Sequence, residues 1–256
     1  MIELHDLRKN FGELKAVDGI NLNIPSGQFY VALGPNAAGK TTTIKMISGL
    51  IKPSSGTVKV AGFDMESDPL EARKRMAYVP DFPFLYDKLT PWEFFRFTVE
   101  LFGMPLEILD TRGMELVERF HLQPYLKKTV ESLSHGTRQR VAIVSALLHD
   151  PEVFVIDEPM VGLDPQHAKI VKDILKERSK AGMTVFLSTH QLSVAEELAD
   201  RIGIIHRGRL IAEGTVADLQ KRMGSESALE QMFLELTAQE DLVREEAESA
   251  SVLESK

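Results

Sequence analysis

The sequence predicts an α/β fold: a mainly parallel sheet, an antiparallel β subdomain and an inserted α-helical subdomain. Two continuous apolar runs, 153–156 and 184–188, have the composition of strands that are buried on both faces. A third run, 29–33, is followed by a glycine-bearing loop and a helix-like segment, 42–50, so that strands and helices alternate. The stretch 86–150 is helical in pattern and has no strong strand, which indicates an insertion.

The residues before the first buried run have the pattern of half-buried strands. Apolar residues at every second position in 2–4 and 20–24 predict antiparallel strands with one buried face. Pro, Ser and Gly at 25–27 and again at 52–56 mark turns, and the second turn is followed by a strand near 57–61.

The helical stretch contains two recognisable helix starts. Thr90 and Glu93 form a capping box with proline at the first helical position, and Ser134 fits an N-cap. We expect the stripe that follows the first start to be helix core rather than a docking face for a partner. The stripe consists of Phe94, Phe95, Phe97, Val99 and Leu101.

The last part of the chain changes character. The runs 202–205 and 209–212 flank a turn and predict a hairpin. Apolar residues at positions 229, 232, 233 and 236 have the spacing of a short amphipathic helix. Beyond residue 237 the chain is acidic and poor in aromatic residues, so we expect disorder there.

Composition narrows the function classes. The 256 residues carry a formal net charge of −8, which argues against a general nucleic-acid binder. There is no cysteine, so disulfides and thiolate chemistry are excluded. No apolar run approaches the length of a membrane span, and the N-terminus lacks the pattern of a secretory signal. We therefore expect a cytoplasmic protein without direct membrane insertion.

The loop after 29–33 fits the phosphate-binding pattern G-x-x-x-x-G-K-[ST], the P-loop. A strand, such a loop and a helix start direct backbone N–H groups at an anion, so the sheet is predicted to be a P-loop NTPase core. Lys40 is expected to reach the β- and γ-phosphates, and the Thr41 hydroxyl to ligate Mg²⁺. The alternative is a chance match, which the flanking strand and helix disfavour. The predicted nucleotide-binding residues are Gly34, Pro35, Asn36, Ala37, Ala38, Gly39, Lys40, Thr41 and Thr42.

Polar side chains follow the two later buried runs. Asp157 and Glu158 come directly after 153–156, at a strand end where open parallel sheets bind ligands. Asp157 can hold Mg²⁺ through water, and Glu158 can orient or deprotonate an attacking water. His190 follows 184–188 and can hydrogen-bond a γ-phosphate. The alternatives are a solvated acidic pair and an ordinary surface or core histidine.

A helix start near residue 136 is a second candidate anion site. Ser134 is a small polar cap, and a helix N-terminus attracts anions. Taken alone, a plain capped helix explains these residues better.

Together these motifs resemble the ATP-binding cassette (ABC) family, and within it the ATPase subunits of ABC-2-type transporters, which are mainly exporters. The resemblance covers 2–219, and the motifs follow in the family's order. Phe11 falls where family members carry an aromatic residue that stacks on adenine. After the P-loop come Leu133-Ser134-His135-Gly136-Thr137 in place of the LSGGQ-like signature, Walker-B Asp157-Glu158, Gly162-Leu163-Asp164 in place of the D-loop, and switch His190.

The resemblance implies a dimer of cassettes that uses ATP and Mg²⁺. One cassette's P-loop leaves the γ-phosphate open on one side, and the facing cassette would close the site with its signature residues. Hydrolysis with Glu158 as base would then release the dimer. The resemblance implies catalytic roles for Lys40, Glu158 and His190, metal contacts for Thr41, Asp157 and Asp81, and nucleotide contacts for Phe11, the P-loop residues, Ser134, Gly136 and Asp164.

The resemblance also implies partners and domain limits. A transmembrane permease subunit would hold the protein at the cytoplasmic face of the inner membrane and dock near 81–86. The aromatic side chains there could equally pack in the core. We expect an ATP-binding domain over 1–224, with a core of 1–85 and 151–224, the helical subdomain 86–150, and a C-terminal part 225–256 that holds the amphipathic helix and the acidic tail.

Five positions depart from the family pattern. Ala37 stands where many P-loops carry glycine, and a positive φ there would cost alanine about 1 kcal/mol. Asp81 stands in place of the Q-loop glutamine and cannot donate a hydrogen bond, although it can approach Mg²⁺. Thr137 replaces the last glutamine of the signature, and Met160-Val161 replace small polar residues before the D-loop.

Three functions fit these residues. The first is an ATPase subunit that powers a membrane transporter, with export as the expected direction. The second is a soluble ABC ATPase without a transport role, although such relatives generally have two fused cassettes or coiled-coil insertions. The third is a regulatory module that binds nucleotide without hydrolysis, for which Ala37 and Asp81 are the only support.

Overall fold

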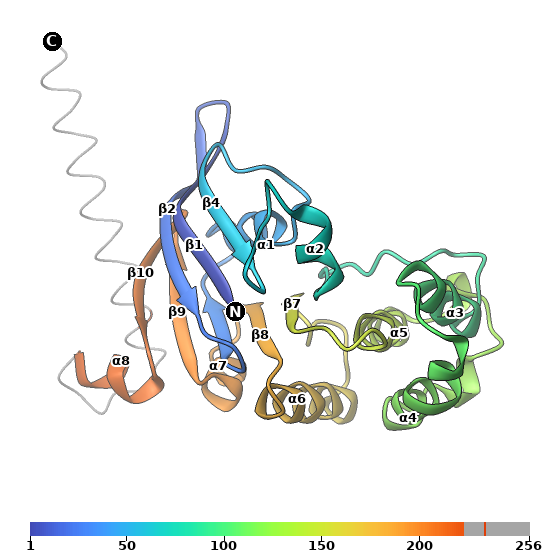
Figure 1. Ribbon diagram of the computed structural model, residues 1–256. Helices are drawn as coiled ribbons and strands as arrows, with labels where there is room; N and C mark the ends of the chain where they lie inside the picture. The colour runs from blue at the N-terminus through green and yellow to red at the C-terminus, as the bar shows by residue number, and fades with distance from the viewer. Residues whose placement is uncertain (223–232, 234–256) are drawn as a thin grey trace, which may run out of the picture.

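The computed structural model describes residues 1–222 and residue 233. The antiparallel strands form one end of the molecule and the helical insertion the other, as Figure 1 shows. The predicted amphipathic helix and the acidic tail beyond residue 237 lie outside the described residues, apart from Phe233, which packs against the larger core. The domain limits stay predictions.

The N-terminal strands form a four-stranded antiparallel sheet, as predicted. Its strands follow the order β2-β1-β4-β5. Ile2 pairs with Ile24 and Leu4 with Leu22, so the alternating apolar residues share one buried face. The strands are β1 (Ile2–Phe11), β2 (Leu14–Ile24), β4 (Ser55–Val60) and β5 (Phe63–Asp64).

The second sheet has six strands in the order β10-β9-β3-β8-β7-β6. Five of them run parallel, and β10 pairs antiparallel with β9 as the predicted hairpin. The sequence pattern missed β6, because its four residues are too few to stand out beside a helix. The strands are β3 (Phe29–Leu33), β6 (Met76–Val79), β7 (Val153–Asp157), β8 (Thr184–Thr189), β9 (Arg201–His206) and β10 (Arg209–Gly214).

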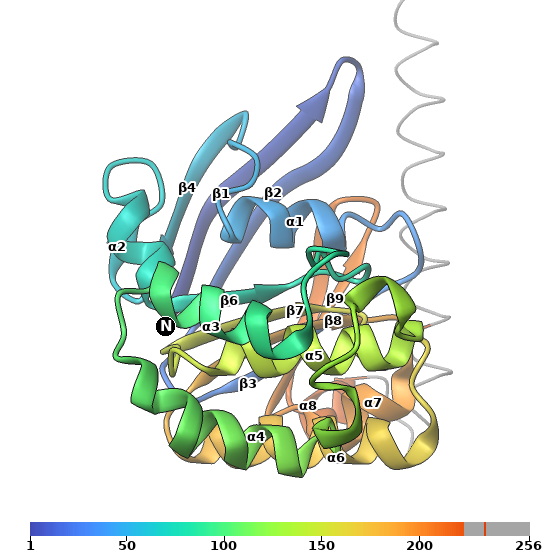
Figure 2. The ribbon, with the colours of Figure 1, turned by 90° about the vertical axis from the view of Figure 1, so that its right-hand side faces the viewer.

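Helices cover both faces of this sheet, and Figure 2 shows α1 above the strands and α5 and α6 below them. The first helix begins at Lys40, two residues before the predicted start, because Gly39 adopts a φ of 102° and turns the loop directly into the helix. The helices of the core are α1 (Lys40–Ile47), α2 (Pro69–Lys74), α6 (Pro165–Lys180), α7 (Leu192–Leu198) and α8 (Val216–Arg222).

The insertion contains α3 (Pro91–Leu101), α4 (Met114–Arg119) and α5 (His135–Leu147). The capping box of Thr90 and Glu93 is present with both reciprocal hydrogen bonds. Short helical turns link these helices: η1 (Leu106–Ile108), η2 (Leu109–Gly113), η3 (Gln123–Tyr125) and η4 (Val130–Ser132).

The aromatic stripe of α3 divides between core and surface. Phe95 and Val99 are fully buried, as expected for helix core. The core prediction is wrong for Phe97 and Leu101, which are exposed because they lie on the outer face of the helix. A helix face wider than its buried contact leaves such residues at the surface.

The six-stranded sheet separates two hydrophobic cores. In β3, Val31 and Leu33 join the core beneath the helical layer, whereas Tyr30 and Ala32 join the core around α1 and the antiparallel sheet. This alternation is the two-residue period of a strand. Both faces are thereby buried, and the polar residues gather at the carboxyl ends of the strands.

Candidate active site

The P-loop connects β3 to α1 and holds its lysine inward. Ala37 has a φ of 63°, so the position where many family members carry glycine does require the left-handed backbone. The Lys40 amine donates hydrogen bonds to the carbonyls of Gly34 at 2.7 Å and Pro35 at 2.9 Å. Burial lowers the pKa of Lys40, while the nearby Glu158 and Asp157 raise it. The loop therefore presents a positive charge that is only 5% exposed.

Asp157 ends β7 and joins the P-loop to the neighbouring strand. The Thr41 hydroxyl donates to one of its carboxylate oxygens at 2.7 Å, and Ser188 of β8 donates to the other. Asp157 and Ser188 are paired residues in the parallel register of β7 and β8. Strand register and helix start thus place two oxygen ligands, the Thr41 hydroxyl and the Asp157 carboxylate, side by side.

Glu158 follows with a φ of 46°, an uncommon backbone conformation for glutamate. Its amide donates to the Ser188 carbonyl at 3.0 Å, which fixes the turn. One carboxylate oxygen lies 2.9 Å from Nδ1 of His190, and the other accepts from the Thr189 hydroxyl at 3.1 Å. The Lys40 amine is 3.9 Å away. The structure brings together the three residues predicted to be catalytic.

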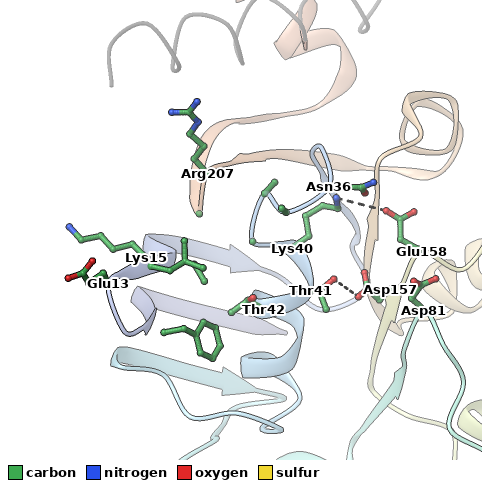
Figure 3. A pocket seen from close by; sticks show the side chains of 17 residues that line it. Glu13, Lys15, Asn36, Lys40, Thr41, Thr42, Asp81, Asp157, Glu158 and Arg207 are labelled. Atoms are coloured by element: carbon green, nitrogen blue, oxygen red, sulfur yellow. Dashed lines mark hydrogen bonds and ion pairs between the residues drawn. The ribbon is translucent and has the colours of Figure 1, made fainter. Parts of the chain in front are cut away.

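These groups open into a cavity of about 780 Å³, drawn in Figure 3. Three predicted residues do not line the cavity themselves. The Gly34 and Pro35 carbonyls accept hydrogen bonds from Lys40, and His190 contacts Glu158. The predicted residues in the wall are Phe11, Asn36, Ala37, Ala38, Gly39, Lys40, Thr41, Thr42, Asp81, Asp157 and Glu158.

Sequence reasoning missed part of the wall. It comes from the tip of the β1–β2 hairpin, residues 13–16, and from the β9–β10 turn, Arg207 and Gly208. The Gly208 amide donates to the Ala38 carbonyl at 2.8 Å, so this turn packs on the P-loop. A hairpin was predicted there, but no local spacing connects residue 208 to residue 38.

Phe11 ends β1 at the mouth of the cavity. Its ring is half exposed, and the Lys9 amine lies 5.3 Å from the ring centroid. An exposed aromatic face at a polar cavity is suited to stacking on a flat base.

Asp81 adds a third carboxylate to the cavity. It follows β6, and its Oδ1 atom is buried without a hydrogen-bond partner. Burial raises the pKa of Asp81, and the negative charges of Asp157 and Glu158 raise it further. His135 and His190 lower the pKa of this carboxylate, but the net direction remains upward.

The signature and D-loop residues do not line this cavity. Ser134 is exposed and caps α5, where its Oγ accepts from the Thr137 amide at 3.3 Å. Gly136 packs so closely on the D-loop that an added Cβ would lie 2.7 Å from the Gly162 carbonyl oxygen. Asp164 caps α6 and accepts from the His167 amide at 3.0 Å. Three predicted nucleotide ligands thus lie on a separate surface.

The donor set fits Mg²⁺, although residues 1–222 contain no cluster of three or more His, Asp or Glu side chains with metal-ligand geometry. Mg²⁺ typically takes one or two protein ligands and completes its shell with substrate phosphates and water. Thr41 Oγ1 and Asp157 Oδ2, 2.7 Å apart, are hard oxygen donors of this kind.

Comparison with known proteins now gives the family. The profile of the ABC transporter family matches residues 17–161, more than half of the 256 residues. The chain belongs to the ABC transporter family. It is an ATP-hydrolysing cassette of a transporter, and this membership supports the transport interpretation over a soluble non-transport ATPase.

Individual relatives agree with this assignment. The linearmycin resistance ATP-binding protein LnrL of Bacillus subtilis is 36% identical over 230 residues, which are 90% of this chain and 74% of LnrL. The daunorubicin/doxorubicin resistance ATP-binding protein DrrA of Streptomyces peucetius is 38% identical over 224 residues, which are 88% of this chain and 68% of DrrA.

Solved structures share the fold of this ABC chain. The ATP-binding subunit of an ABC transporter superposes with a TM-score of 0.88 at 32% identity, over 93% of this chain and 99% of the subunit. A dimeric cassette in a post-hydrolysis state, bound to ADP and Pi, has a TM-score of 0.76 at 28% identity, over 84% of this chain and 99% of that cassette. Among the helices of residues 1–222, none has the length and apolarity required to cross a bilayer.

Proposed function

We propose that this chain powers export through a separate membrane permease, as one of two cassettes in a dimer that ATP closes. The observation that carries the proposal is the cavity in which Lys40, the Thr41–Asp157 pair and Glu158 meet. The named relatives act in resistance to linearmycin and to daunorubicin and doxorubicin, which supports export over import.

ATP binds in this cavity through the P-loop. Backbone N–H groups at the start of α1 and the Lys40 amine hold the phosphates, and Phe11 stacks on adenine. Thr41 and Asp157 would hold Mg²⁺, and Asp81 lines the same cavity. The ion would supply positive charge that neutralises the charge developing on the phosphates.

Glu158 is the general base. It accepts a proton from the water that attacks the γ-phosphorus, while the bond from this phosphorus to the bridging oxygen of ADP breaks and inorganic phosphate forms. His190 and Thr189 hold the two carboxylate oxygens of Glu158, so the base is oriented before ATP arrives.

A second cassette completes the site. Ser134 and Gly136 at the start of α5, together with Asp164, lie outside the cavity of their own chain and are free to face the phosphates held by a partner. The N-terminus of α5 carries a partial positive charge that suits the γ-phosphate.

The permease docks in a groove of about 600 Å³ between the core and the insertion. Phe82 and Phe84, which follow β6, line it and are exposed, Phe84 to 93%. Tyr86 beside them is also exposed and touches Phe97 edge-on at 5.5 Å between ring centroids. Exposed aromatic residues around a groove mark a protein-interaction surface. This partner places the chain at the cytoplasmic face of the membrane.

The change Glu158→Gln tests hydrolysis. We expect ATP binding to persist while turnover falls by about a hundredfold or more, because the general base is lost. The variant should also form an ATP-dependent dimer in size-exclusion runs. Glu197→Gln, an exposed change on α7, is the control. A Glu158→Gln variant as active as the parent would remove this residue from the mechanism.

Purification from native membranes in mild detergent, followed by mass spectrometry, tests the partner. A stoichiometric polytopic membrane protein is the expected companion. Phe84→Glu should reduce its recovery without changing ATP affinity, because Phe84 does not line the nucleotide cavity. Recovery of the chain only in the soluble fraction would contradict the proposed role in transport.

A further inference from the structure

The exposed hydroxyl of Ser134 is the end of a short chain of hydrogen bonds that begins in the protein interior. Arg140 donates from Nη2 to the Thr137 hydroxyl at 3.2 Å, and the Thr137 and Ser134 hydroxyl oxygens are 2.9 Å apart. Thr137 and Arg140 are each only 4% exposed, whereas Ser134 faces solvent. The chain therefore runs from a buried cation to a surface hydroxyl.

The donor inventory fixes one of these bonds and leaves the Thr137 hydroxyl proton available for the other. A guanidinium has no acceptor, so the Thr137 oxygen must accept from Arg140. The Thr137 hydroxyl proton is then free to point at Ser134 Oγ, which also accepts from the Thr137 amide at 3.3 Å. In the arrangement in which Thr137 donates, both lone pairs of Ser134 Oγ accept from Thr137, and the Ser134 proton points away from the helix, toward whatever binds there.

Arg140 is well anchored for this task. Its Nη1 donates to the Phe120 carbonyl at 2.7 Å, which holds the guanidinium beneath the first turn of α5. Burial lowers the pKa of Arg140, and Tyr125 and the negative charge of Asp164 raise it. A positive charge at the start of a hydrogen-bond chain polarises every bond along it, so the outermost hydroxyl becomes a better donor to an anion.

We propose that Thr137 is a positioning residue that fixes the Ser134 hydroxyl as an outward donor to the γ-phosphate held by the partner cassette. This inference rests on the proposed role of Ser134 in the dimer. It assigns a task to the position at which this chain departs from the usual glutamine of the signature. Thr137 does not line the cavity in which its own chain binds ATP.

The test measures ATP-driven dimerisation in the Glu158→Gln variant, in which slow hydrolysis leaves the ATP-bound dimer intact. Thr137→Val removes the hydroxyl and keeps the shape of the side chain, and Thr137→Ser keeps the hydroxyl. We expect Thr137→Val to raise the ATP concentration for half-dimerisation about tenfold, the usual effect of a lost hydrogen bond to a charged group. ATP binding to the monomer should not change, because that binding uses only the P-loop cavity.

Thr137→Ser should stay within about twofold of the parent, because its hydroxyl can accept from Arg140 and donate to Ser134. Rescue by serine separates positioning from a general loss of packing. In a chain that also carries Ser134→Ala, Thr137→Val should have no further effect, because there is no hydroxyl left to orient.

Two results would overturn the proposal. If Ser134→Ala weakens dimerisation and Thr137→Val does not, or if the two changes add independently, Thr137 does not position Ser134, and the proposed contact of Ser134 with ATP survives. If Ser134→Ala itself leaves ATP-driven dimerisation unchanged, both this inference and the proposed role of Ser134 in the dimer fail.

Discussion

The nucleotide cavity and the start of α5, both of which we propose to bind phosphate, are built in different ways. In the cavity, Lys40 pairs with Glu158 and Thr41 bonds to Asp157, so contacts join α1 to the end of β7, which pairs with β8. At the start of α5, Ser134 is held by a residue of its own helix and opens outward. The cavity is a site with walls, whereas the start of α5 is a contact surface without a cavity. Under the proposed function, a single chain therefore carries two complementary half-sites.

The largest effect is expected on ATP affinity when the cavity loses the positive charge of Lys40. Lys40→Ala should lower ATP affinity by roughly a hundredfold, because two charge-assisted contacts to phosphate disappear. A fluorescent ATP analogue titrated into the purified chain measures this affinity. Lys59→Ala, a change at an exposed position of β4, is the control and should bind like the parent. Unchanged binding by Lys40→Ala would contradict the assignment of the P-loop.

Mixing two inactive chains tests whether the half-sites belong to different subunits. Ser134→Glu introduces a carboxylate at the helix start that repels phosphate, and this variant alone should be as inactive as Lys40→Ala. In an equal mixture, half the dimers should be mixed and hold one intact site, so about a quarter of the parental ATPase rate should return. A mixture that stays inactive would mean that the half-sites do not meet across a dimer.

A smaller effect, on stability, is expected at the contact that supports the β9–β10 turn, the part of the cavity wall that the sequence did not predict. Asp18 of β2 accepts from Arg209 of β10 at 2.8 Å and 3.0 Å, and it also pairs with Arg8. Its carboxylate joins the two sheets behind the cavity, so Asp18→Asn should lower the free energy of unfolding by about 1–2 kcal/mol. Urea unfolding at pH 7 measures this. Asp173→Asn, which breaks an exposed pair on α6, should cost much less.

The same change predicts a pH dependence. Arg209 and Arg8 lower the pKa of Asp18, so the folded state binds this proton less readily than the unfolded state. The stabilisation is complete above the unfolded pKa of about 4 and is lost as the pH falls through the lower folded value. The difference in stability between the parent and Asp18→Asn should therefore shrink in acid. A difference that grows below pH ~4 would contradict this sign.

The smallest effect lies in the P-loop backbone. Ala37 holds a φ of 63°, which glycine adopts without a clash of Cβ. Ala37→Gly relieves this strain but loosens the unfolded chain, so the net gain in stability should not exceed about 1 kcal/mol. Thermal unfolding measures it. A loss of several degrees would show that the alanine methyl group, part of the cavity wall, contributes packing that outweighs the strain.

Local signals predicted much of the fold and half of the site. The buried runs of β3, β7 and β8, the capping box of α3 and the P-loop depend on neighbours in sequence, and all are present. Once β7 and β8 were recognised as parallel, Asp157 and His190 had to share one edge of the sheet.

The rest depends on contacts between distant segments. No sequence pattern joins Gly208 to Ala38 or Asp18 to Arg209, because these pairs meet only after both sheets have formed. The exposure of Phe97 was also beyond a periodic pattern, since an apolar stripe does not say how much of it the rest of the chain covers. The hydrogen-bond chain through Thr137 likewise joins three side chains, Ser134, Thr137 and Arg140, whose contacts no sequence spacing predicts.

The six-stranded sheet that separates the two cores also separates the proposed permease groove from the support of the P-loop helix. Side chains on the helical face pack against the insertion, where the proposed permease groove lies, and those on the other face pack against α1. A change on the first face should therefore alter the surface offered to the proposed permease, whereas a change on the second should alter the support of α1. One fold could in this way serve different permeases while the residues around the P-loop stay the same.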